Sequence, residues 1–145
     1  MSKSSNLGGW PASDMRVYVS TTIFDSLPEI LKQSIISTKV VSGYGSSDSS
    51  NFTSNDKLYL LSSSELCSSN NEYDTASEYT RKLDIYSSID SCSNISPIKN
   101  PGYWWLRSIS KNSSTFMHVK YGTNVSLTGN GSSVETGVSP AFRLG

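Results

Sequence analysis

The spacing of hydrophobic positions changes along the chain, from a helical period near the N-terminus to alternation in the last third. In the first 36 residues, Leu31 and Ile35 lie four positions apart and follow Pro28, a residue that suits the first turn of a helix. Upstream, Ser13 can cap a helix whose first turn begins with the acidic Asp14. These patterns predict two short helices between residues 13 and 36.

The middle of the chain contains short apolar runs between polar stretches. Residues 38–42 (TKVVS) are rich in β-branched side chains and predict a strand, and residues 57–62 (KLYLLS) predict a buried strand. Between them, residues 43–55 have no period and predict a long polar loop. Residues 63–66 can open a helical turn that includes an acid, and residues 72–86 have apolar side chains at helical spacing.

The last third has the alternation that is typical of strands. It predicts strands at residues 103–108, 115–121, 125–128 and 137–144. Turns are expected at residues 122–124 and at Asn130-Gly131, and Pro140 marks the final strand as an edge or a bulge. Helices followed by an antiparallel meander predict an α+β fold, with residues 1–145 forming one domain.

Composition narrows the classes of function. Twelve Lys+Arg balance twelve Asp+Glu among 145 residues, which excludes a protein that binds nucleic acid through bulk positive charge. No apolar run has the length of about 18–20 residues that a membrane span needs, and the polar start is not a signal sequence. Ser, Thr and Asn make up 53 residues, a bias common in disordered chains. Fifteen aromatic residues spread over the whole chain favour a folded domain instead.

Few side chains are candidates for catalysis or metal binding. Cys67 and Cys92 allow one disulfide or two thiols, but one His and two Cys do not complete a zinc site. His118 is the only imidazole, and no nucleophile motif accompanies it. Asp84 and Asp90, or Asp48 near Asn51, could contribute oxygens to calcium, although no EF-hand spacing is present. We therefore expect no cofactor, with calcium as the less favoured alternative.

The string YWWLRS carries the largest side chains of the meander. Trp104 and Trp105 point to opposite faces of their strand, so one should enter the core while the other covers the second face. Arg107 is expected to hold the meander together through a carboxylate or loop carbonyl groups. A ligand-binding Arg107 is the less favoured alternative.

Five blocks of sequence resemble an uncharacterised bacterial and phage domain family whose members end in WWLRS and GVRPAL-like segments. The blocks are Gly8-Gly9-Trp10 with Ser13-Asp14-Met15-Arg16, then Asp25-Ser26-Leu27-Pro28, then residues 56–62 with Glu65, then residues 102–108, and finally residues 137–144. Such domains look like the C-type-lectin fold, in the version shared with formylglycine-generating enzymes and with the variable proteins of diversity-generating retroelements. The resemblance implies a binding module on a cell surface or phage tail and no catalytic activity in itself.

Three departures from that pattern affect what the resemblance implies. Ser139 stands where the family commonly has Arg, so a salt bridge made by that Arg is absent. Cys67 and Cys92 precede the WWLRS block and do not match the late copper-binding cysteine pair of formylglycine-generating enzymes. In a C-type-lectin fold the terminal strand pairs with a strand before the first helix, and residues 1–9 are too short and polar for that role. We expect either a fragment of a larger protein or a partner strand elsewhere, such as in another subunit.

The leading hypothesis is a non-catalytic ligand-binding domain, with carbohydrate or protein as ligand, in an extracellular, cell-surface or virion setting. Alternation places Met117, Val119, Val125 and Leu127 inward, which leaves their neighbours outward. The candidate ligand-contacting residues are Tyr103, Lys111, Asn112, Phe116, His118, Lys120, Tyr121, Asn124, Ser126, Thr128 and Asn130. The alternative is a structural domain of a surface or virion assembly, alone or as a homo-oligomer. An enzyme of the formylglycine-generating type is ranked below both.

Overall fold

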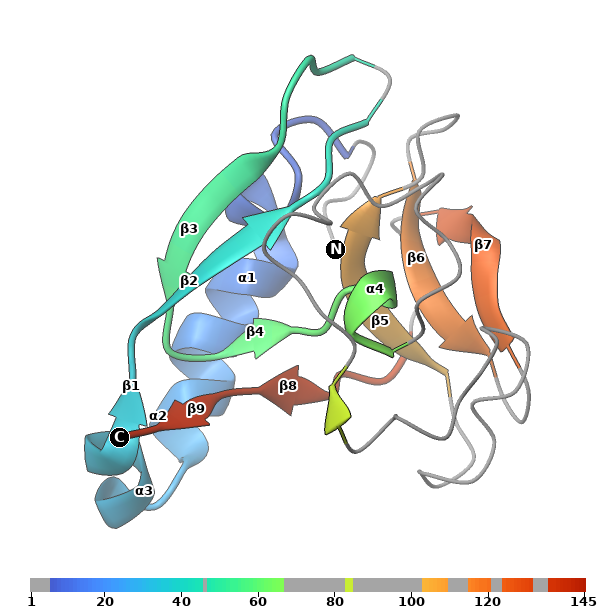
Figure 1. Ribbon diagram of the computed structural model, residues 1–145. Coiled ribbons are helices and arrows are strands. Elements are labelled where there is room, and N and C mark those ends of the chain that lie inside the picture. Colours follow the sequence, from blue (N-terminus) through green and yellow to red (C-terminus); the bar gives the residue numbers. More distant parts are fainter. Residues whose placement is uncertain are drawn as a thin grey trace.

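A computed structural model describes residues 6–45, 47–66, 83–84, 103–109, 115–120, 124–131 and 136–145 of the chain. Short helices near the N-terminus precede four small sheets, three of two strands and one of three (Figure 1). The described part is therefore a mixed α/β structure with a few short helices and small antiparallel sheets. Cys67, Cys92 and most of the helix expected at residues 72–86 lie outside the described residues.

The two predicted N-terminal helices are confirmed. After a short 3-10 turn, Trp10–Ala12, helix α1 spans Asp14–Tyr18, and its N-cap Ser13 accepts a hydrogen bond from the backbone N–H of Arg16. The helical path continues through a π-turn, Val19–Ile23, and α2, Phe24–Ser26. Helix α3 spans Glu29–Ser34 and follows Pro28, as the sequence indicated.

Strand β2 spans Thr38–Ser42, as predicted, and pairs along its whole length with β3, Phe52–Asp56. The expectation of a polar loop over residues 43–55 is therefore wrong at its C-terminal end. Phe52, Ser54 and Asp56 are less exposed than Thr53 and Asn55, so β3 does alternate, but Phe52 is its one apolar side chain. The pairing with β2, rather than a hydrophobic pattern, stabilises this strand.

The three-stranded meander is confirmed, with one correction. Its strands are β5 (Trp104–Ile109), β6 (Thr115–Lys120) and β7 (Asn124–Gly131), in the spatial order β5-β6-β7. Asn130 and Gly131 do not form a turn, because they continue β7 opposite Phe116 and Thr115. A register shift between Phe116 and His118 lets the longer β7 follow β6.

The C-terminal segment joins three of the sheets (Figure 1). Gly137 bridges to Trp104 of β5. Strand β8, Pro140–Ala141, pairs with β4, Tyr59–Leu60, and β9, Arg143–Leu144, pairs with β1, Ile35–Ile36. The terminal segment thus pairs with strands of the same chain that follow the N-terminal helices.

The hydrophobic core lies between the helices, β2, β4 and the meander. It consists of Trp10, Val19, Ile35, Val40, Leu58, Tyr59, Leu60, Trp105, Ile109 and Phe116. The Gly8-Gly9-Trp10 block is explained at Gly9, whose φ is 61° and where a Cβ would lie 2.7 Å from the Phe52 ring. Glycine at this position lets the backbone approach β3 and places the Trp10 ring in the core.

A polar network fixes Trp10 from the other side. The indole Nε1 of Trp10 donates to Asp56 Oδ2 at 2.9 Å, and Ser54 donates to the same oxygen at 2.6 Å. Arg16 pairs with Asp56 Oδ1 through Nε and Nη2, both at 2.8 Å. Helix α1 is therefore attached to β3 by a buried carboxylate with three partners.

Among the described helices, none has the length and apolar composition needed to cross a membrane.

Candidate functional site

The structure changes the face of the meander that the sequence predicted as exposed. Phe116 and His118 are buried, so the expectation that they point to solvent is corrected. Phe116 belongs to the hydrophobic core together with Trp105 and Ile109, and Ile109 is its register partner on β5. Met117 and Val119 are buried as well. Because both faces of β6 are covered here, alternation could not identify an outer face.

The remaining candidate residues are described only in part. Lys111, Asn112 and Tyr121 lie outside the described residues. For Lys120, Asn124, Ser126, Thr128 and Asn130 the structure describes the backbone, which places them in β6 and β7. Ser126 lies opposite His118, and Asn124 lies opposite Lys120.

Tyr103 is the candidate residue whose side chain is both described and exposed. Tyr103 is 43% exposed and immediately precedes β5. The Tyr103 ring stacks on the His118 ring with centroids 5.9 Å apart and planes inclined by 25°. His118 in turn meets Trp105 edge-on at 6.0 Å. The three rings form a column, which we call the aromatic stack, running from the core to the surface.

The sequence could not predict this stack, although it named all three residues. Trp105 and His118 are paired across β5 and β6, and that register depends on long-range strand pairing. Trp105 is the buried member of the Trp104–Trp105 pair, and Trp104 is half-buried opposite Val119. The sequence pattern predicts that the two tryptophans point to opposite faces of their strand. It does not predict which strand pairs with them.

Arg107 is buried and holds four elements together. Its Nε donates to the carbonyl of Val41 on β2 at 3.0 Å, and its Nη1 donates to the carbonyl of Leu60 on β4 at 2.8 Å. The same Nη1 pairs with the carboxylate of Glu65 on α4, Ser63–Leu66. The Arg107 backbone N–H donates to Leu61 at 3.0 Å. These contacts give the guanidinium the role of a structural centre.

Two partners in these networks, Glu65 and Asp56, belong to a resemblance block, but nothing in the sequence indicated which residues they contact. Glu65 was expected in a helical turn, but nothing in its spacing pointed to Arg107, which lies 42 positions later. Asp56 lies 40 positions after Arg16, and it was included only as the first residue of one resemblance block, without a role. Such pairs are created by the fold, and a single sequence contains no period that could reveal them.

Of the candidate calcium ligands, Asp90 lies outside the described residues, and the described ones are not gathered into a site. Asp48 accepts a hydrogen bond from the Gly8 backbone at 3.3 Å, and Asp84 lies far along the chain beside α4, where the Leu83 N–H donates to the Glu65 carbonyl. Among the described residues, no group of three or more His, Cys, Asp or Glu side chains is arranged to hold a metal ion.

Comparison with known proteins gives one match. A family model described as "Domain of unknown function (DUF6273)" matches residues 1–145, and the chain therefore belongs to this family. No curated protein and no solved structure matches the chain at the threshold of significance.

Proposed function

We propose that this member of the DUF6273 family is a non-catalytic recognition module that binds a protein or carbohydrate ligand. The observation that carries the proposal is the aromatic stack, which presents the Tyr103 ring to solvent on a buried support of His118 and Trp105. The binding surface then includes Tyr103. The module acts at a cell surface or on a phage virion.

Restricting the Tyr103 ring before a ligand binds favours affinity. An exposed tyrosine loses side-chain entropy when a ligand immobilises it, and this loss lowers affinity. Stacking on His118 restricts the Tyr103 ring before any ligand arrives. A tyrosine held in this way offers apolar area and a hydroxyl group at a small entropic cost, which is why binding surfaces are rich in tyrosine.

We further propose that the fold is a variant of the C-type-lectin fold. The order of elements supports this, because helices come first, a three-stranded meander follows, and the terminal segment returns to pair with β1 and β4. The pairing of β9 with a strand that follows the helices is the point at which the chain departs from that fold. A diversified variable protein of a retroelement is one version of this proposal.

A second candidate function is a structural domain in a larger assembly. Apolar side chains are exposed around α3, β1 and β9, with Ile30 78% exposed and Leu144 61% exposed. Ile36 is exposed in the same sheet as Leu144. Exposed apolar side chains at one end of a domain favour contact with another domain or chain.

The test is a binding screen against glycans and surface proteins, with and without calcium, for the wild type and two variants. Tyr103→Ala removes the outer ring of the aromatic stack. Phe142→Ala removes an exposed aromatic ring next to β9 and is the matched control. We expect a specific ligand whose binding is lost in Tyr103→Ala and kept in Phe142→Ala. Equal binding by both variants would contradict the assigned surface, and a folded wild type that binds nothing would favour the structural domain.

A further inference from the structure

Gly137 lies beside β5 on the edge opposite β6, next to the residues of the aromatic stack. Its backbone N–H donates to the carbonyl of Tyr103 at 2.7 Å, and its own carbonyl accepts from the backbone N–H of Trp105 at 3.1 Å. The two hydrogen bonds form a parallel bridge around Trp104, whose partner on β6 is Val119. Gly137 thus fixes the backbone on both sides of Trp104.

Two of the three residues in the aromatic stack are held by this bridge. Tyr103 and Trp105 lie two positions apart, so in an extended chain their side chains point to the same face. His118 on β6 meets both of their rings. Trp105 is also held by the hydrophobic core, whereas Tyr103 is exposed and precedes the strand. The hydrogen bond from Gly137 therefore acts where packing supports the stack least.

A side chain at position 137 does not fit against β5. A Cβ at this position would lie 2.7 Å from the carbonyl oxygen of Tyr103, closer than Cβ atoms approach other atoms in proteins. The oxygen belongs to the backbone, so no rotation of a side chain removes the contact. Glycine is needed at position 137 because the two backbones approach each other closely.

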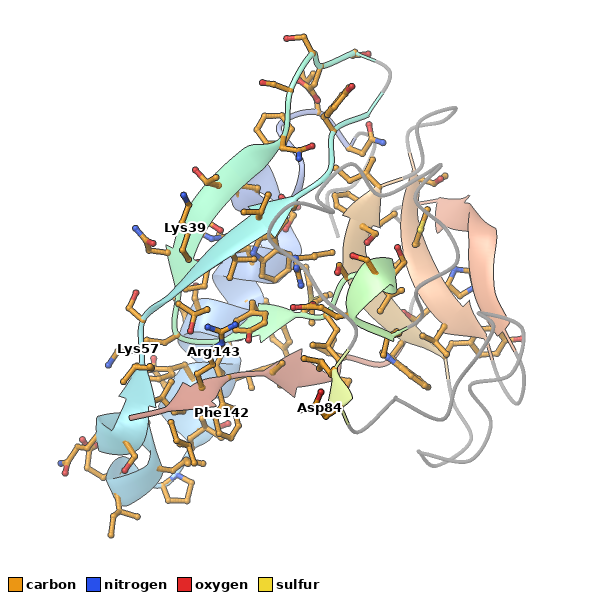
Figure 2. All side chains as sticks on the ribbon, viewed as in Figure 1. Lys39, Lys57, Asp84, Phe142 and Arg143 are labelled. Atoms are coloured by element: carbon orange, nitrogen blue, oxygen red, sulfur yellow. The ribbon has the colours of Figure 1, made fainter. Side chains whose placement is uncertain are left out.

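The C-terminal segment that carries Gly137 is anchored beyond this residue. Val138 packs against the hydrophobic core, and β8 follows it and pairs with β4. Farther along, Arg143 points from β9 toward β2 (Figure 2) and is hydrogen-bonded to Tyr59. While these contacts remain, Gly137 can move little away from β5.

A methyl group at position 137 must then be accommodated on the side of β5. Trp105 is buried in the core, and its close packing resists displacement. Tyr103 lies just outside the strand, and its ring contact with His118 is a weak restraint. The backbone of Tyr103 is therefore the part that yields, and its displacement moves the ring away from His118.

We propose that Gly137 is a positioning residue for the binding surface, because it holds the Tyr103 ring in the stacked orientation in which a ligand meets it. The inference rests on the proposed function, in which Tyr103 contacts the ligand. Gly137 acts on Tyr103 through the backbone, so its contribution to binding is indirect. Preorganisation of the ring thus depends on the C-terminal segment as well as on the meander.

The test follows the ring signals of His118 by NMR, which are unambiguous because the chain has one histidine. Stacked aromatic rings shift each other's proton signals, so the His118 signals report whether the Tyr103 ring is in place. Tyr103→Ala gives the signals of a stack without its outer ring, and Gly137→Ala is the test variant. Gly145→Ala is the matched control, because its Cβ would lie just as close, 2.6 Å, to a side-chain carbon of the exposed Ile36.

We expect the His118 signals of Gly137→Ala to move from their wild-type positions to those of Tyr103→Ala. The signals of Gly145→Ala should stay at the wild-type positions. Urea unfolding of each variant ensures that folded chains are compared. Unchanged His118 signals in folded Gly137→Ala would overturn the positioning role, and so would an equal change in Gly145→Ala. Complete unfolding of Gly137→Ala would also overturn it, because Gly137 would then support the whole fold.

The screen against glycans and surface proteins, repeated with the two glycine variants, connects the position of the ring to binding. Each glycan or protein that Tyr103→Ala no longer binds should bind Gly137→Ala at least about tenfold more weakly than the wild type. Gly145→Ala should bind it as the wild type does. Wild-type affinity in a Gly137→Ala variant whose ring is displaced would overturn the proposed function, because Tyr103 would then not contact the ligand. The two failures are distinguishable, since the His118 signals require no ligand.

Discussion

Glu65 and Arg107 form a buried ion pair that joins α4 to β5 across 42 positions of the sequence. Removing one partner of a buried pair leaves the other charge uncompensated in a poorly solvated environment. The same guanidinium also carries the hydrogen bonds to Val41 and Leu60. Damage to this pair should therefore loosen β2, β4 and β5 together.

The first prediction concerns Glu65→Ala. We expect it to lower the free energy of unfolding by about 3–5 kcal/mol, because Arg107 stays buried without its carboxylate. Glu29→Ala is the matched control, since Glu29 pairs with Lys32 at 2.9 Å on the surface of α3. That variant should unfold like the wild type. The measurement is urea unfolding, and similar losses in both variants would contradict the structural role of the buried pair.

The second prediction compares two buried serines. Ser108 accepts a hydrogen bond from the Ser63 backbone N–H at 2.9 Å, whereas Ser42 Oγ makes none within the described residues. Ser108→Ala should cost about 1–3 kcal/mol of unfolding free energy, because a buried N–H loses its acceptor. Ser42→Ala should be neutral or stabilising. A larger loss in Ser42→Ala than in Ser108→Ala, measured by urea unfolding, would show that the hydrogen bonds are assigned wrongly.

Elements with local signals were predicted well from the sequence. The Ser13 cap, Pro28 before α3 and the β-branched run of β2 each act within a few residues, so a single sequence reveals them. Strand β3 was missed because four of its five side chains are polar and because it depends on its pairing with β2. Phe116 was placed on the wrong side because β6 is covered on both faces.

In the candidate site too, the sequence indicated individual residues but not the long-range contacts between them. The sequence named Tyr103, His118 and Trp105 individually, but their stacking depends on the register between β5 and β6. Arg107 was predicted to contact a carboxylate or carbonyl groups, yet Glu65 could not be chosen among twelve acidic residues. Long-range pairing is decided by the whole fold, and no local spacing records it.

The third prediction concerns the pH dependence of stability. Burial raises the pKa of Tyr59 above its usual value of 10.0, so the folded chain holds this proton more tightly than the unfolded chain does. The resulting stability is fully present below pH 10 and is lost as the pH rises through the folded-state pKa. Tyr59→Phe lacks this group. The difference in unfolding free energy between wild type and Tyr59→Phe should therefore shrink above about pH 10. Urea unfolding of both proteins across that range measures it, and a constant or growing difference would contradict the prediction.

The fourth prediction separates the two aromatic residues that the sequence placed on one exposed surface. Phe116 is buried in the core, so Phe116→Ala should lower the free energy of unfolding by about 3–5 kcal/mol through lost burial and a cavity. Tyr103 is exposed and contacts the His118 ring, so Tyr103→Ala should cost about 1 kcal/mol, the value of one ring contact.

The same two variants also distinguish the roles of the residues in binding. Tyr103→Ala remains folded, so a loss of ligand in that variant reports on the binding surface itself. In Phe116→Ala, any loss of ligand should follow the unfolded fraction, because Phe116 supports the sheet from within. Urea unfolding and ligand binding measured on the same samples provide the comparison. A stable Phe116→Ala variant that no longer binds would place Phe116 on the ligand-contacting face after all, and would restore the alternation that the sequence suggested.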